Sequence, residues 1–140
     1  MKILRSVLFA LTVLVMATAA QAQQTNLKAD IPFDFVVGDR TYPAGEYALK
    51  SMTMSDVVIR IDNTKEDLIG NIISNQCTSA KPATDSKLIF HRMGDHYFLY
   101  QIWVAGNSSG RQFTKSREEV ELAQNHEKLE STIVAAKIIH

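Results

Sequence analysis

Apolar and polar residues alternate with a period of two along most of the chain, which is the pattern of β-strands with one buried face. The alternation is clear from Val57 to Asp62, where Val57, Ile59 and Ile61 would share the buried face. Short clusters of glycine, proline, asparagine or aspartate separate the apolar segments and are typical of turns. The expected strands are 31–37, 40–42, 46–50, 57–62, 68–74, 87–92, 96–104 and 132–139.

Two irregular features interrupt this pattern. Gly70 lies inside an expected strand and predicts a β-bulge. The segments 78–86 and 106–110 are polar and are expected to be loops, the second a flexible connection between apolar segments.

One helix is expected, beginning after Ser116. Ser116 and Glu119 have the spacing of a capping box, and further glutamates follow in the first turn. Val120, Ala123 and Leu129 would form the buried stripe of this helix.

These elements predict an all-β fold in a single domain. About eight short strands with turns between them are typical of a β-sandwich or a small β-barrel, and one short helix in the C-terminal half completes either. The pattern does not choose between the two architectures.

The N-terminal segment has the three parts of an export signal. Lys2 and Arg5 form a basic start, an apolar run follows, and the small residues ending at Ala22 supply a cleavage site. We therefore expect a signal peptide over 1–22 and a single domain over 23–140. The apolar run is shorter than the roughly 20 residues that a spanning helix needs, which argues against an uncleaved anchor. No later segment is long and apolar enough to span a membrane as a helix, so no membrane span is expected after cleavage. In a bacterium the mature protein would be periplasmic or secreted.

Charge and composition exclude several classes of function. The chain has 15 basic and 15 acidic side chains, and cleavage would remove two basic ones, so the mature domain is slightly acidic. Such a domain has no electrostatic reason to bind nucleic acid. Its 46% hydrophobic content is too high for a disordered protein. No motif indicates a cofactor.

Cys77 is the only cysteine, so it cannot form an internal disulfide. Its polar neighbours place it at the start of a loop. It is a buried small side chain, a reactive thiol, or an exposed thiol that links two copies in a Cys77 homodimer.

The most suggestive group for chemistry surrounds the turn of the 87–104 hairpin. His91, Asp95 and His96 would lie near one another there, and two imidazoles with one carboxylate are a plausible metal-binding set. The alternative is a polar hairpin end with two solvated histidines.

Aromatic residues lie on or beside most of the expected strands. They form the core of the domain, or some point outward to bind a ligand or partner. Tyr100 and Trp103 are the candidates for ligand binding, because strict alternation puts them on opposite faces of one strand.

Several blocks of the chain together resemble a family of small, uncharacterised, exported β-rich proteins of soil bacteria. The resemblance implies a secreted β-domain over about 31–123 and assigns no catalytic residue or ligand. The residues that carry it are Phe33, Phe35, Val37, Pro43-Ala44-Gly45, Tyr47, Phe90-His91-Arg92, Gly94-Asp95, Tyr97-Phe98-Leu99, Ile102-Trp103, Ser116, Glu118 and Glu121-Leu122-Ala123.

Three functions remain open at this stage. The first is an exported, non-enzymatic domain that binds or supports an envelope protein or glycan. The second is a small barrel that carries an apolar or aromatic ligand. The third is a metal-assisted hydrolase that uses His91, Asp95 and His96, for which the sequence supplies no catalytic geometry.

Overall fold

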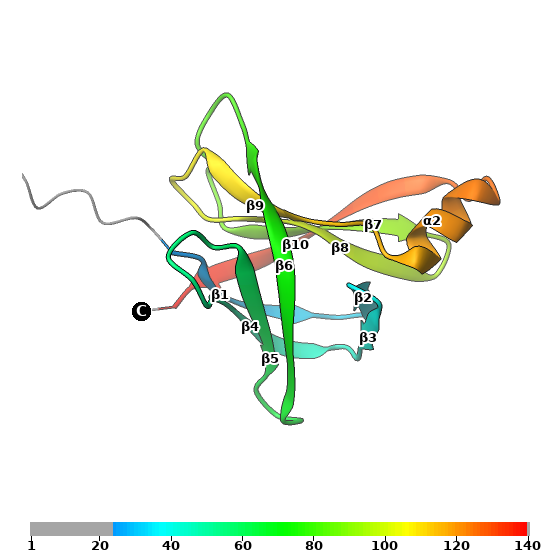
Figure 1. Ribbon diagram of the computed structural model, residues 1–140, viewed down its shortest axis with the longest axis horizontal. Helices are drawn as coiled ribbons and strands as arrows, with labels where there is room; N and C mark the ends of the chain where they lie inside the picture. Colours follow the sequence, from blue (N-terminus) through cyan, green and yellow to red (C-terminus); the bar gives the residue numbers. More distant parts are fainter. Residues whose placement is uncertain (1–23, 140) are drawn as a thin grey trace, which may run out of the picture.

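Eight strands form a closed antiparallel β-barrel in the computed structural model, which describes residues 24–139 (Figure 1). Neighbouring strands follow the order β8-β7-β10-β1-β4-β5-β6-β9, and β9 pairs with β8 to close the ring. Of the two architectures expected, the barrel is correct. Its strands are β1 (Asn26–Ile31), β4 (Gly45–Ser51), β5 (Val58–Asn63), β6 (Leu68–Thr78), β7 (Lys87–Met93), β8 (His96–Trp103), β9 (Ser109–Phe113) and β10 (Leu129–Ile138).

Three further elements lie outside this ring. The hairpin of β2 (Phe35–Val37) and β3 (Arg40–Tyr42) joins the sheet through one parallel pairing, between Val36 of β2 and Phe98 of β8. The helix α2 (Arg117–Gln124) lies beside the turn between β7 and β8 (Figure 1).

An aromatic cluster fills one end of the barrel. The ring of Phe35 stacks on Tyr42 at 5.4 Å between centroids, and it meets Tyr47 and Phe90 edge to face at 5.1 and 5.6 Å. All four side chains are at most 1% exposed. Such rings contribute large buried apolar areas, so this cluster is a main source of stability for the domain.

β6 is the longest described strand, and each of its halves pairs with a different neighbouring strand. Its first half, from Leu68 to Ile73, pairs with β5, and its second half, from Ser74 to Thr78, pairs with β9. β6 therefore crosses the barrel wall from one neighbour to the next (Figure 1).

The structure corrects several boundaries. Of the expected strand 31–37, Ile31 is the last residue of β1, residues 35–37 form β2, and Phe33 lies in the bend between them. Residues 26–30 of β1 were not expected to be a strand. The loop expected at 106–110 includes the start of β9, and β6 continues four residues beyond its expected end at Ser74. The predicted export signal, residues 1–22, lies outside the described residues.

Candidate functional site

A surface groove lies between two strand edges that are distant in sequence. β3 pairs only with β2, and β9 reaches β6 only from Ser74 onward, so the first half of β6 has β5 as its one strand neighbour within residues 24–139. The groove between them has a volume of about 550 Å³. The β2–β3 hairpin and residues 69–73 of β6 line it, and we call it the β3–β6 groove.

The backbone of β6 presents unpaired groups to this groove. Ser74 donates its N–H to the carbonyl of Val57 on the β5 side at 2.7 Å. Alternate residues of an antiparallel strand direct both backbone groups to the same side, so Ile69 and Asn71 direct theirs away from β5. Arg40 confirms this direction, because its Nη1 donates to the Ile69 carbonyl at 2.9 Å.

The side chains along this edge are apolar or uncharged. Ile69 is 40% exposed, Ile73 is 70% exposed, and Asn71 between them is also exposed. Proteins normally protect a free strand edge with charged residues or proline, and residues 69–73 contain neither. Asp39 and Arg40, from the opposite wall, are the charged residues that line the groove.

The floor of the groove depends on a close contact between Tyr42 and Gly70. A Cβ atom at Gly70 would overlap the Tyr42 hydroxyl. Gly70 pairs with Ile61 without a shift of register, so the predicted bulge is wrong. Glycine is required here by the close approach of a side chain from another strand. Burial raises the pKa of Tyr42.

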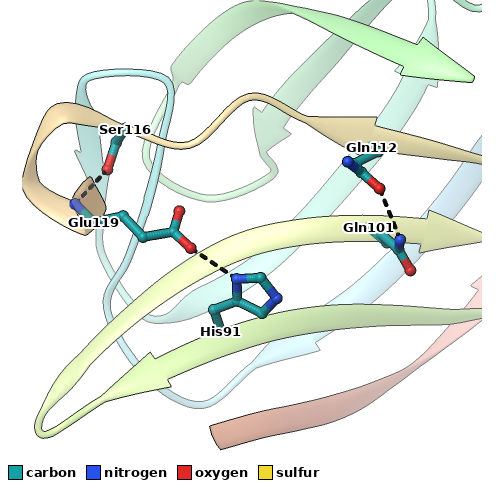
Figure 2. A network of polar contacts seen from close by, with 5 residues as sticks. All are labelled: His91, Gln101, Gln112, Ser116 and Glu119. Atoms are coloured by element: carbon teal, nitrogen blue, oxygen red, sulfur yellow. Dashed lines mark hydrogen bonds and ion pairs between the residues drawn. The ribbon is translucent and has the colours of Figure 1, made fainter. Parts of the chain in front are cut away.

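A buried polar contact attaches α2 to the barrel (Figure 2). The carboxylate of Glu119 lies 2.7 Å from Nδ1 of His91, and both residues are buried. Ser116 caps the helix as predicted, because its hydroxyl accepts the Glu119 N–H at 3.2 Å. The expected apolar stripe is wrong: Val120 is 42% exposed, and Glu119 is the buried residue of the helix.

The structure does not gather the predicted metal ligands into one site. His91 is paired with Glu119 of α2, whereas His96 lies on the surface with Nδ1 3.0 Å from the Glu118 carboxylate. Asp95 is exposed in the turn. Within residues 24–139, no group of three or more His, Cys, Asp or Glu side chains is placed to hold a metal ion.

Tyr100 and Trp103 both contact other residues of the chain. β8 has an irregularity opposite Ile89 and Phe90, where Tyr100 is the unpaired residue, so the strict alternation that separated the two rings does not hold. Tyr100 stacks on His91 at 3.8 Å, and Trp103 donates its Nε1–H to Gln101 at 3.1 Å. Neither ring lines the β3–β6 groove. Their role in ligand binding stays a prediction.

Cys77 lies within β6, opposite Gly110 of β9, and not in a loop. It is half-buried, and burial raises the pKa of its thiol. A thiol with a raised pKa is less ionised and a poorer nucleophile at neutral pH. This environment does not support a Cys77-linked homodimer.

The residues of the groove were not found from the sequence. Arg40 belongs to a hairpin that joins the sheet through one parallel pairing, between Val36 and Phe98, which are 62 positions apart along the chain. A local pattern of alternation carries no information about such a contact. The uncharged run from Ile69 to Ile73 is the sequence signal that could have indicated an unprotected edge.

Comparison with known proteins adds no relative. No family model, no curated protein and no solved structure matches the chain. Among the described residues, no helix has the length and apolar character to cross a membrane.

Proposed function

We propose that this protein is an exported, non-catalytic binding module that takes an extended segment of a partner protein into the β3–β6 groove. The observation that carries the proposal is the backbone of Asn71, whose N–H and carbonyl face the groove while no described strand pairs with them. Export, with a location in the periplasm or outside the cell, rests on the signal pattern of residues 1–22.

The groove favours a peptide backbone over other occupants. An unpaired strand edge recognises any extended segment through main-chain hydrogen bonds, and its exposed side chains then select the sequence. Ile69 and Ile73 favour apolar side chains at alternate positions of the partner. The guanidinium of Arg40 donates to the Ile69 carbonyl and would have to release it before the backbone of a partner could pair with that carbonyl.

The rest of the fold supports a structural role for the barrel itself. A small β-barrel with a buried aromatic cluster is compatible with holding a ligand or with presenting a surface. Since Phe35, Tyr42, Tyr47 and Phe90 fill one end of the interior, that end works as a rigid support for the hairpin that forms one wall of the groove.

Site-specific photo-crosslinking tests the proposal. The photoreactive residue p-benzoylphenylalanine replaces Asn71 in one exported protein and Ile133 in a control, and crosslinked segments are identified by mass spectrometry. Ile133 is a suitable control because it is 62% exposed on β10, away from the groove. The segment captured at position 71 is then synthesised as a peptide.

The peptide should protect the Asn71 amide from hydrogen exchange, and it should lose its binding to Asn71→Pro. Proline lacks the N–H that faces the groove, whereas the β5 ladder does not use that group. The variant Ile133→Lys should bind like the wild type. Equal binding to Asn71→Pro, or equal capture at both positions, would refute the proposal, and capture of a second copy alone would refute the choice of partner.

A further inference from the structure

A buried arginine lies inside the barrel, at the end opposite the aromatic cluster. Arg111 is on β9, two residues before Phe113 of the core, so its side chain points to the same interior face. It is 8% exposed. Its Nε donates to the Ser74 hydroxyl at 2.9 Å, and its Nη2 donates to the Ser74 carbonyl at 2.7 Å.

The guanidinium of Arg111 is not in an ion pair with any carboxylate of the described residues. Both of its hydrogen bonds go to the neutral acceptors of Ser74. A guanidinium has five N–H donors, so these two bonds leave the Nη1 group available. Burial of a charge without a partner is costly, and an anion at this place would offset that cost.

A cavity reaches this guanidinium from the solvent. Near the start of β8, Tyr97 stacks on Phe33 at 3.8 Å, and Phe33 meets Phe90 of the aromatic cluster edge to face at 5.0 Å. At the other end of the strand Ile102, together with Val104 just beyond it, lines a cavity of about 320 Å³. Arg111 and Gln76 also line this cavity. An eight-stranded barrel has an interior wide enough for one small ligand when side chains do not fill it. We call this cavity the barrel mouth.

Asp56 limits the charge of any ligand at the barrel mouth. It lines the same cavity, and its carboxylate accepts hydrogen bonds from the N–H and the hydroxyl of Thr25, at 3.3 and 3.1 Å. These bonds hold a negative charge at the wall of the cavity. It repels every negative charge of a ligand, so a ligand with two or more negative charges is repelled more strongly than a single carboxylate, whose one charge Arg111 can offset.

We propose that the barrel mouth binds a small monocarboxylate with an apolar body. The carboxylate is held by the free N–H groups of Arg111, because guanidinium and carboxylate match in a planar, two-bonded geometry. The apolar body lies against Ile102 and Val104. This site is separate from the β3–β6 groove and does not depend on it.

Nuclear magnetic resonance of the mature protein tests this site with three probes: octanoate, 1-octanol and inorganic phosphate. Octanoate should shift the Arg111 Nε–H signal and the backbone amides of Gln76 and Gly110. The alcohol has the same apolar body without the charge, so its dissociation constant should be at least about tenfold higher. Phosphate should cause no saturable shift, because of Asp56.

A matched pair of variants tests the role of the guanidinium. Arg111→Gln should raise the dissociation constant of octanoate at least about tenfold, and Arg60→Gln, which removes the same charge from the barrel exterior, should leave it unchanged. If Arg111→Gln does not fold, the comparison of octanoate with 1-octanol in the wild type decides. Equal affinity for both probes, or shifts confined to residues away from the barrel mouth, would overturn the proposal.

Discussion

The contact between Gly70 and Tyr42 makes the substitution Gly70→Ala a sensitive test of the groove. A Cβ atom at position 70 would overlap the Tyr42 hydroxyl and would lie 3.1 Å from its Cζ. The Tyr42 ring cannot withdraw freely, because it stacks on Phe35 at 5.4 Å and meets Tyr47 at 6.1 Å. The added methyl group must therefore displace β6 or the aromatic cluster.

We expect Gly70→Ala to destabilise the protein, whereas a glycine-to-alanine substitution at an unstrained position usually stabilises it. Replacement of glycine by alanine at an unstrained position stabilises a protein by about 0.4–1 kcal/mol, through the entropy of the unfolded chain. Overpacking of a well-packed site costs about 1–3 kcal/mol. Since the overlap here is with a buried ring, we expect Gly70→Ala to lower the free energy of unfolding by about 1–2 kcal/mol.

A double-mutant cycle assigns this loss to the hydroxyl. Tyr42→Phe removes the overlapping atom, and the remaining 3.1 Å approach to Cζ needs only a small shift. In urea denaturation, the Tyr42→Phe background should reduce the cost of Gly70→Ala by about 1 kcal/mol at an unchanged m-value. The reasoning is refuted if Gly70→Ala is as stable as the wild type, or if its cost is the same in both backgrounds.

Three further predictions concern the cap, the thiol and the buried tyrosines. Ser116→Ala should lower the free energy of unfolding by about 1 kcal/mol in urea denaturation, because the Glu119 N–H loses its acceptor, and Ser116→Asp should restore it. Cys77 should react with a thiol reagent at neutral pH more slowly in the folded than in the urea-unfolded protein, since burial raises its pKa; equal rates would contradict this. Burial also raises the pKa of Tyr42 and Tyr47 above the ordinary 10.0, so the stability that these two tyrosines contribute should be constant below that pH and fall as the pH rises above it. Denaturation at a series of alkaline pH values, with phenolate absorbance as a second measure, checks this prediction. Ionisation of both tyrosines with a pKa of 10.0 in the folded protein would contradict it.

Most strands with an alternating apolar face could be predicted from the sequence, but β1 before Ile31 and the whole of β9 were missed. β9 has polar residues and Gly110, which together resemble a flexible loop. In the structure Gly110 is buried, and a Cβ there would lie 2.8 Å from both the Ile102 carbonyl and a ring carbon of Trp103. The glycine is required by the close approach of β8, which a local pattern cannot show.

The choice between a β-sandwich and a β-barrel also depended on β9. Closure of the ring requires β9 to pair with β8, and two residue pairs make that contact, Gln101 with Gln112 and Ile102 with Arg111. The side chains of Gln101 and Gln112 add a hydrogen bond of 2.9 Å across it (Figure 2). Because residues 106–110 were assigned to a loop, β9 was not among the expected strands, and the pattern could not choose the barrel over the sandwich.

The candidate sites escaped prediction for a related reason. His91 was assigned a partner across its own hairpin, whereas its partner is Glu119, 28 residues further along the chain. Arg111 is charged and has polar neighbours in the sequence, so the pattern gave no indication of burial. It is buried because Ser74, 37 residues earlier, supplies both of its acceptors. In both cases the partner of the polar side chain is distant in the sequence and is brought close by the fold.

The two proposed sites share a physical property that distinguishes them from the rest of the barrel. A buried cation without a counter-ion and an unpaired strand edge both reduce the stability of the free protein. Neither is needed for the strand pairing that closes the barrel, because that pairing joins the backbones of β8 and β9 and uses neither the Arg111 side chain nor the β6 edge at Asn71. A ligand that binds only the folded state raises the free energy of unfolding, and this gain grows with the logarithm of the ratio of ligand concentration to dissociation constant. Each occupant should therefore recover the stability lost at its own site. The positions of Arg111 and Asn71, at the barrel mouth and in the β3–β6 groove, therefore argue for two separate occupants whose stabilising effects add.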